Sequence, residues 1–422
     1  MAFGGDVAEM NAAHGSLTRR RRRLGRSATS ASVLAIGLLA ASGAVATAEP
    51  PRPATAADGA TQWNHIATGW FYSCGIQLRN TLWCWGQNHS GQLGIGTKQY
   101  PNQPQQVTRP AVAGWATITA GYDHTCATRK DGTLWCWGDN GSGQLGIRTF
   151  VSHTLPRQIG IPETSGWAGV SAGIDDTCAV RTDTSLWCWG YNGYGTVGIG
   201  TTTLPKDKPH RVTTPAATGW VSVAVGGQQA CATRTDGTLW CWGYNGNGEL
   251  GIGTTSSHED KPQQVITPDT TGWVSVAAGA DHTCATRADT SLWCWGSNGS
   301  GQLGDGTKTM QDLPQQVTTP TVAGWTSVTA GGAQTCAIRT HALWCWGRNY
   351  DGQLGIGTNM GHWRPRRVLV PAKRGWGLIA ASGYHTCATR TGHTLWCWGY
   401  NGYGELGLGN NTWHNLPQQV TA

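Results

Sequence analysis

The chain has 422 residues, a formal net charge of +7 and only 13% charged residues, together with 24 tryptophans, 62 glycines and 14 cysteines. Six arginines lie within the first 26 residues, and the remainder is mildly basic, with no long run of lysine or arginine. This composition argues against nucleic acid as a partner, because proteins that bind it carry a strongly basic face or stripe.

Residues 1–48 have the pattern of an export signal peptide. A basic segment, Arg19 to Arg23, precedes a short apolar core, Val33 to Ala40, and Ala46-Thr47-Ala48 matches a small-residue cleavage site. The apolar core is too short to span a membrane comfortably. We therefore expect a secreted, extracellular protein with no membrane span after the leader is removed. Residues 49–61, rich in proline and alanine, are expected to be a flexible lead-in.

Residues 62–422 consist of seven copies of one unit, shown best by Ala120 to Gly146, and equivalent cysteines recur every 51 to 53 residues. Each copy contains runs typical of four short strands, such as Trp115 to Ala120, Thr125 to Arg129, Thr133 to Trp137 and Pro104 to Val107. No helical period appears between them. The sequence therefore predicts an all-β fold, a seven-bladed β-propeller with four antiparallel strands per blade.

The two cysteines of each copy flank a short turn. If Lys130-Asp131-Gly132 is a three-residue hairpin loop with its glycine in the left-handed region, Cys126 lies opposite Cys136. Thr184 and Thr290, at the same place in two other copies, fit such a loop less well. We predict seven disulfides, each within its own repeat: Cys74–Cys84, Cys126–Cys136, Cys178–Cys188, Cys231–Cys241, Cys284–Cys294, Cys336–Cys345 and Cys387–Cys397.

Reduced thiols or a metal site are the alternatives to disulfides. No Cys-x-x-Cys motif occurs and no histidine recurs beside the pairs, so we expect neither a metal nor a cofactor. Persistent disulfides require an oxidising compartment, which agrees with the export signal.

Other recurring residues are assigned to the scaffold. The Leu-Trp-Cys-Trp-Gly run of every copy supplies fourteen tryptophans to packing between blades, and an arginine three residues after the first cysteine is expected to stack on them. The Gly-Gln-Leu-Gly segments, such as Gly143 to Gly146, open no helix, so they are not phosphate-binding loops. Their glycines are expected to adopt positive φ in a tight connection.

Three segments carry a family resemblance: Trp-Gly-x-Asn-x-x-Gly-Gln-Leu-Gly from Trp137, Pro-x-x-Val from Pro104, and Gly-x-x-His-Thr-Cys-Ala from Gly121. Together they resemble the repeat of the regulator of chromosome condensation family, whose members are seven-bladed propellers. The setting is similar to that of a secreted bacterial member, the β-lactamase inhibitory propeller. This resemblance implies that loops on one face grip a partner through aromatic residues.

Variable loops stand beside constant strands in every copy, which is how a binding surface is built on a rigid scaffold. We expect the loop between the first and second strands to share a face with the loop between the third and fourth. The predicted binding face comprises Phe71, Tyr72, Tyr122, Asp123, His124, Asp175, Asp176, Gln228, Asp281, His282, Tyr384 and His385. Tyr191, Tyr194, Tyr244, Tyr400 and Tyr403 belong to the second set of loops.

The functional hypothesis is a secreted, monomeric, non-catalytic propeller that binds an extracellular protein or glycan. One alternative is a glycan hydrolase that uses face aspartates such as Asp123, Asp175 or Asp176, since such enzymes need two nearby carboxyl groups with different pKa values. Another is an inhibitor of a secreted or cell-wall enzyme. No Ser-His-Asp pattern or metal-ligand motif supports catalysis, so the sequence assigns no catalytic residue.

Overall fold

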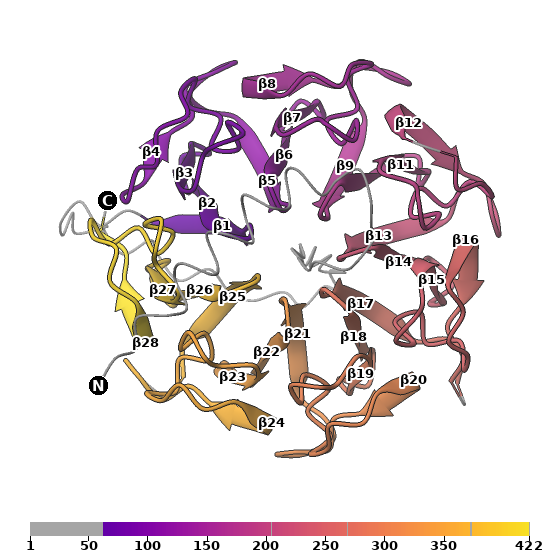
Figure 1. Cartoon of the computed structure of the whole chain (residues 1–422), viewed down its shortest axis with the longest axis vertical. Coiled ribbons are helices and arrows are strands. Elements are labelled where there is room, and N and C mark those ends of the chain that lie inside the picture. Colours follow the sequence, from indigo (N-terminus) through magenta and orange to yellow (C-terminus); the bar gives the residue numbers. More distant parts are fainter. Residues whose placement is uncertain (1–61, 204, 268, 372–373, 422) are drawn as a thin grey trace, which may run out of the picture.

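The computed structural model describes residues 62–203, 205–267, 269–371 and 374–421. These residues form a closed ring of seven four-stranded antiparallel sheets and no helix (Figure 1), which confirms the predicted β-propeller. The expected signal peptide and lead-in, residues 1–61, lie outside the described residues. No helix long and apolar enough to cross a lipid bilayer occurs in the part that is described.

Each sheet is one blade, and its strands follow each other in chain order from the centre of the ring to its rim (Figure 1). The innermost strands are β1 (Trp63–Thr68), β5 (Trp115–Ala120), β9 (Trp167–Ala172), β13 (Trp220–Val225), β17 (Trp273–Ala278), β21 (Trp325–Ala330) and β25 (Trp376–Ala381). The second strands are β2 (Tyr72–Gln77), β6 (His124–Arg129), β10 (Asp176–Arg181), β14 (Gln229–Arg234), β18 (His282–Arg287), β22 (Gln334–Arg339) and β26 (His385–Arg390).

The third strands are β3 (Leu82–Gly86), β7 (Leu134–Gly138), β11 (Leu186–Gly190), β15 (Leu239–Tyr244), β19 (Leu292–Gly296), β23 (Ala342–Gly347) and β27 (Leu395–Gly399). The rim strands are β4 (Gln105–Gln106), β8 (His153–Gln158), β12 (Lys206–Val212), β16 (His258–Gln264), β20 (Gln311–Gln316), β24 (His362–Arg367) and β28 (His414–Gln419). We number the blades 1 to 7 in the same order.

The hairpin between the second and third strands has the predicted register. Cys126 pairs with Cys136 across β6 and β7, and all seven cysteine pairs form disulfides with Cα atoms 4.1 Å apart. Gly132 takes φ 75° in the turn, and Thr184 and Thr290 take φ 63° and 64°. The threonines therefore adopt the left-handed conformation that they were expected to fit less well.

The hydrophobic core is divided into seven clusters, and each cluster joins two neighbouring blades. Trp115 and Trp137 of blade 2, for example, pack with Leu82 and Cys84 of blade 1. Trp137 is fully buried, whereas Trp135 is partly exposed at the edge of the same cluster. The tryptophans of the Leu-Trp-Cys-Trp-Gly run thus pack between blades as predicted.

The recurring arginine stacks on a tryptophan, as expected, but not on one of the tryptophans that the sequence indicated. Arg129 lies over the ring of Trp115 at 5.3 Å, and equivalent pairs recur in blades 3, 4, 5 and 7 at 5.1 to 5.6 Å. Its stacking partner is the tryptophan that opens the innermost strand, rather than one from the Leu-Trp-Cys-Trp-Gly run. The role of this arginine is therefore structural.

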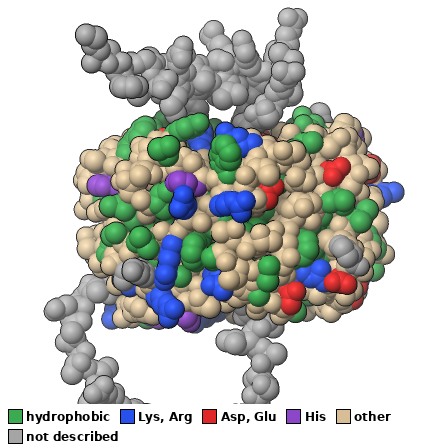
Figure 2. Space-filling model, turned by 90° about the horizontal axis from the view of Figure 1, so that it is seen from below, with side chains coloured by type: hydrophobic (Ala, Val, Ile, Leu, Met, Phe, Trp, Pro, Cys, Tyr) green, Lys and Arg blue, Asp and Glu red, His purple; other side chains and the backbone are tan. Residues whose placement is uncertain are grey.

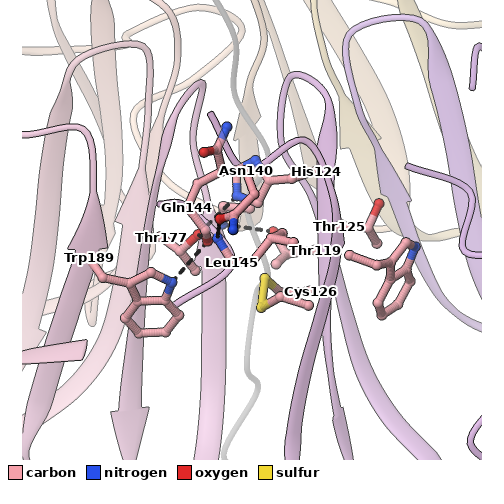
Figure 3. The surroundings of a disulfide bond; sticks show 12 residues. Thr119, His124, Thr125, Cys126, Asn140, Gln144, Leu145, Thr177 and Trp189 are labelled. Carbon is pink, nitrogen blue, oxygen red and sulfur yellow. Dashed lines mark hydrogen bonds between the residues drawn. A yellow bond between two sulfur atoms is a disulfide. The ribbon is translucent and has the colours of Figure 1, made fainter. Parts of the chain in front are cut away.

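One backbone carbonyl per blade links that blade to the next. In blade 2 it is the oxygen of Gln144, which accepts hydrogen bonds from the indole Nε1 of Trp189 at 2.9 Å and from the hydroxyl of Thr177 at 2.8 Å (Figure 3). We call this oxygen the bridging carbonyl. It belongs to Gln92, Gln144, Thr196, Glu249, Gln302, Gln353 and Glu405.

The indole bond occurs at all seven junctions, at 2.8 to 2.9 Å. A glycine two residues after the bridging carbonyl makes room for the indole. At Gly146, where φ is 68°, a Cβ atom would lie 2.7 Å from Nε1 of Trp189. This contact explains why the second glycine of Gly-Gln-Leu-Gly recurs.

The ring closes with the same contact and without strand exchange. Strand β28 pairs with β27 of its own blade, so blades and repeats coincide. Glu405 of blade 7 supplies the bridging carbonyl for Trp85 and Ser73 of blade 1, at 2.8 Å each. Val420 packs beside Trp63 in the cluster that joins these two blades.

The disulfides generate a direct prediction. Each closes a loop with a sequence separation of 9 or 10 residues, for which loop-closure entropy gives about 3 kcal/mol of stabilisation. The double variant Cys126→Ala/Cys136→Ala should therefore lose at least that much free energy of unfolding in denaturant titrations. Non-reducing peptide mapping should find every bridge within its own blade, and bridges between blades or fourteen free thiols would contradict the assignment.

Candidate binding face

The two predicted sets of loops lie on one face of the ring. The Gln92 side chain, in the loop between β3 and β4, donates from Nε2 to Asp123 Oδ1, in the loop between β5 and β6, at 3.0 Å. Phe71, in the loop between β1 and β2, contacts Tyr403, in the loop between β27 and β28, with ring centroids 5.4 Å apart. We call the surface formed by these loops the loop face.

Two sets of hydrogen bonds fix the loops. A buried asparagine anchors each long outer loop: Asn140 Oδ1 accepts from the backbone N–H of Leu145, and its Nδ2 donates to the carbonyls of Thr149 and Val151. The short inner loops are joined backbone to backbone, as in the bond from Gly227 N to Gly279 O at 2.9 Å. The loop face is therefore pre-ordered.

Aromatic side chains form a continuous cluster on this face where blades 1 and 7 meet. Trp70 contacts Tyr122 at 5.0 Å and Tyr384 at 5.5 Å, and Phe71 stacks on Tyr384 at 5.3 Å. We call this set the aromatic cluster. It comprises Trp70, Phe71, Tyr100, Tyr122, Tyr384, Tyr400, Tyr403 and Trp413.

The cluster has a buried centre and an exposed margin. Trp70 and Phe71 are buried, whereas Tyr100 is 45% exposed and Trp413 is 44% exposed. Trp413 packs on Tyr400 with centroids 4.5 Å apart. It also lines a cavity of about 240 Å³ that includes Asp351 and Asn359.

Five residues that the sequence placed on the binding face have side chains buried in the strands below the loops. They are Tyr72, His124, Asp176, His282 and His385, all at most 3% exposed. The Tyr72 hydroxyl donates to the backbone oxygen of His124 in the next blade at 2.7 Å. These five residues open the second strands, so they support the loops from below instead of forming the contact surface.

The other predicted residues lie in the loops themselves. Tyr122, Asp175, Gln228, Asp281 and Tyr384 are partly buried, and Phe71 and Asp123 are buried at 7% and 8% exposure. Tyr122 and Tyr384 meet through Trp70 in the aromatic cluster. A smaller aromatic group lies at blades 3 and 4, where Tyr194 contacts Tyr191 and Tyr244 with centroids 6.2 and 5.2 Å apart. The predicted face is thus one surface with its largest aromatic cluster at one junction.

The buried histidines bridge neighbouring blades. Nε2 of His124 lies 2.9 Å from the Thr177 hydroxyl, Nε2 of His282 lies 2.9 Å from that of Thr335, and the same contact recurs from His385 to Ser73. Burial lowers the pKa of His124 to about 4 and that of His282 and His385 to about 3. All three are therefore neutral at physiological pH.

The face aspartates are engaged or desolvated. Asp123 accepts from Gln92 and lies 3.2 Å from His89 Nε2, and Asp175 accepts from Gln144 Nε2 at 3.3 Å. Burial raises the pKa of Asp281 and raises that of Asp176 well above its ordinary value. No group of three possible metal ligands occurs in the described ranges.

Sequence reasoning missed two buried acids that carry bridging carbonyls, Glu249 and Glu405. Burial raises the pKa of Glu249 to about 7 and raises that of Glu405 well above its usual range. In the other blades the equivalent residue is Gln92, Gln144, Gln302, Gln353 or Thr196. The signal that could have found them is the replacement of the recurring glutamine by glutamate at this position in blades 4 and 7.

Three aromatic members of the cluster were also missed: Trp70, Tyr100 and Trp413. Trp70 stands in an inner loop where four other copies have glycine or alanine, such as Gly227, and the other two have Tyr122 and Ile174. Tyr100 and Trp413 lie in outer loops far apart in the sequence. Only closure of the ring brings them to one junction.

The comparisons with known proteins agree with this architecture. The regulator of chromosome condensation (RCC1) repeat matches residues 79–128, 131–180, 183–233, 236–286, 289–338, 341–389 and 393–422. The chain belongs to this repeat family. The resemblance inferred from the sequence is therefore confirmed.

Among the family's members, the ultraviolet-B receptor UVR8 of Arabidopsis thaliana is 30% identical to this chain over 312 residues. The aligned region covers 72% of this chain and 69% of the receptor. The chain is 28% identical over 373 residues to the human E3 ubiquitin-protein ligase HERC2, which covers 86% of this chain but only 8% of the ligase.

Solved structures of the family share the fold. Yeast RCC1 (Prp20), in its complex with Kap60, matches with a TM-score of 0.72 and 18% identity, over 89% of this chain and 91% of that chain. Human WBSCR16 matches with a TM-score of 0.70 and 19% identity, over 78% and 86%. At these identities the likeness shows the fold alone.

The histidine bridges predict a pH dependence of stability. Because their folded-state pKa values lie below 6.5, the unfolded chain takes up protons first as pH falls. Stability should therefore be lost between about pH 6.5 and about pH 3 to 4. The triple variant His124→Gln/His282→Gln/His385→Gln should lose less stability over this pH range, because glutamine does not take up a proton. It should also fold normally, since blades 4 and 6 already have Gln229 and Gln334 at the equivalent position.

Urea titrations across this pH range would measure the effect, with His258→Gln, a substitution of a histidine on a rim strand, as the control. A triple variant whose stability falls as steeply with acid as that of the unaltered protein would show that these histidines are not the source.

Glu249 generates the opposite dependence. Its folded-state pKa of about 7 lies above the ordinary 4.5. The stability that this carboxyl group contributes is therefore fully present below pH 4.5 and is lost as pH rises through 7. Glu249→Gln should raise the free energy of unfolding at pH 8 by a few kcal/mol, on the order of the pKa difference, and the gain should vanish near pH 4.5. We expect the amide of the variant to donate to Asp281 in the next blade, as the amide of Gln92 donates to Asp123.

Glu259→Gln, in strand β16, is the matched control and should have no comparable effect. Equal stability of Glu249→Gln and the unaltered protein at pH 8 would contradict the burial cost assigned to this carboxyl group.

Proposed function

We propose that this chain is a secreted, non-catalytic propeller that binds an extracellular protein partner through the loop face. The aromatic cluster at the junction of blades 1 and 7 carries the proposal. Its exposed rings, Tyr100 and Trp413, pack on Tyr403 and Tyr400, which in turn contact the buried Phe71. The surface therefore offers large apolar area at little entropic cost. Hot spots of protein interfaces have this composition.

The setting supports a partner outside the cytoplasm. Seven disulfides fit an oxidising compartment, and residues 1–48 have the pattern of an export signal. Related propellers are known in complexes with proteins, as for yeast RCC1 (Prp20) bound to Kap60. The present chain would use the same scaffold toward a different, extracellular partner.

The experiment uses the purified mature protein as bait for culture supernatant and cell-envelope extract of the source organism. A protein captured by the bait is then purified, and its dissociation constant is measured. Tyr100→Ala/Trp413→Ala should weaken binding at least 30-fold, because truncation of an aromatic anchor costs about 2 kcal/mol or more. Thermal unfolding should be unchanged, since both side chains lie at the exposed margin.

Two controls separate the loop face from the rest. Phe150→Ala removes an exposed ring from an outer loop of blade 2 outside the aromatic cluster, and Asp131→Ala/Asp236→Ala alters turns of the opposite face. Both should bind normally. Loss of binding in the aspartate variant, with normal binding of Tyr100→Ala/Trp413→Ala, would overturn the proposal. A captured enzyme that loses activity when bound would specify the function as inhibition.

A glycan hydrolase is the second candidate, and one observation favours it. Glu249 has a pKa of about 7, and Asp281 in the next blade contributes to that rise after burial. Glycoside hydrolysis uses two carboxyl groups of which one has a raised pKa and serves as the acid. Turnover on a polysaccharide panel that is lost in both Glu249→Gln and Asp281→Asn would support this candidate, and no turnover would remove it.

A further inference from the structure

The rim of blade 6 is unlike that of the other blades. Strand β24 reads His362-Trp363-Arg364-Pro365-Arg366-Arg367, with no acidic residue. The equivalent strand of blade 7, β28, reads His414-Asn-Leu-Pro-Gln-Gln419, in which the tryptophan and all three arginines are replaced by uncharged residues. The buried proline at the same place in both strands fixes the alignment. The rim strand of blade 3, β12, also has three basic residues, but it includes Asp207 and has no tryptophan. Among the rim strands, β24 is thus the one that combines three positive charges with an aromatic ring and no acidic residue.

These side chains line a cavity at the junction of blades 5 and 6. Its volume is about 300 Å³, and its walls are Gly306, Gly361, His362, Trp363, Arg364 and Arg366. Trp363 is 46% exposed, and the ammonium group of Lys308 lies 4.7 Å from its ring centroid. Figure 2 views this side of the ring, and Lys and Arg side chains gather there over β24.

The arginines of the cavity are held in place but are not neutralised. Arg364 donates from Nη1 to the Thr319 hydroxyl at 3.1 Å, and Arg366 donates from Nε to Nδ1 of His362 at 3.3 Å. Within the described part of the chain, no carboxylate forms an ion pair with Lys308, Arg364 or Arg366. Each guanidinium therefore retains donors for an anion.

We propose that this rim pocket binds an anionic polysaccharide. A sugar ring packs on Trp363, and its acidic substituent binds the guanidinium groups of Arg364 and Arg366, with Lys308 as a third cation. A guanidinium suits this task because its planar fork matches carboxylate and sulfate oxygens. The pocket lies on the rim and shares no residue with the aromatic cluster, so this inference stands apart from the proposed function.

The geometry favours a glycan over nucleic acid. Single-stranded nucleic acid is bound along grooves that present several stacking platforms in succession, whereas this cavity contains one tryptophan. The disulfides also fit an extracellular setting, where acidic polysaccharides are available.

The test measures binding of the mature protein to polygalacturonate, dextran sulfate, uncharged dextran and single-stranded oligothymidylate. The two acidic polysaccharides distinguish carboxylate from sulfate as the preferred group. Arg364→Leu/Arg366→Gln and Trp363→Asn each install residues that β28 already has, so they should fold normally. Each should weaken binding of the preferred acidic polysaccharide at least tenfold, and uncharged dextran should not bind.

The matched control is Lys208→Leu/Arg157→Gln, which removes two positive charges from the equivalent rim positions of blades 3 and 2, where no tryptophan is present. It should retain binding within twofold. The proposal is overturned by equal losses in the control and pocket variants, by unchanged binding in Trp363→Asn, by tighter binding of oligothymidylate than of either polysaccharide, or by no binding at all.

Discussion

The bridging carbonyl is the interaction on which the rest of the structure depends. At every junction its oxygen accepts the indole N–H of the next blade at 2.8 to 2.9 Å, and at six of the seven junctions it also accepts a hydroxyl group. In this propeller no strand is shared between the first and last blades, because β28 pairs within its own sheet. Repetition of one buried contact replaces strand exchange as the means of closure.

This contact also connects scaffold to function. The residue that supplies the carbonyl lies in the outer loop, and its side chain points toward the inner loop of the next blade, as Gln92 does to Asp123. The residue whose carbonyl joins two blades therefore also helps to position the loop face. Such a rigid base allows loops to vary, and the aromatic cluster occupies the one junction where the first and last repeats meet.

The repeat itself allowed the fold to be predicted, because cysteine spacing and strand alternation agreed across seven copies, although Thr184 and Thr290 departed from the turn chemistry of the others. The sixth copy is one residue shorter than the others in the turn at Thr340-His341, yet Cys336 still pairs with Cys345, so the pairing persists when the turn changes length. The candidate site was predicted less well. Tyr72 and His124 look like loop residues, but the strand begins with them and their side chains enter the junction. The contacts of Tyr400 with Phe71 and of Tyr403 with Tyr100 join the first blade to the last, so they depend on ring closure, which no local pattern encodes.

The most direct test compares two indoles of blade 1. Trp85 donates to the bridging carbonyl of blade 7, and Trp83 donates to Thr81 within its own blade. Trp85→Phe should lower the free energy of unfolding by about 1 to 3 kcal/mol, because it removes one of the two donors to the buried Glu405 carbonyl and leaves only the Ser73 hydroxyl. Trp83→Phe should cost less than about 1 kcal/mol. Denaturant titration should show a single transition for both. Equal stability of the two variants would contradict the central role of this contact.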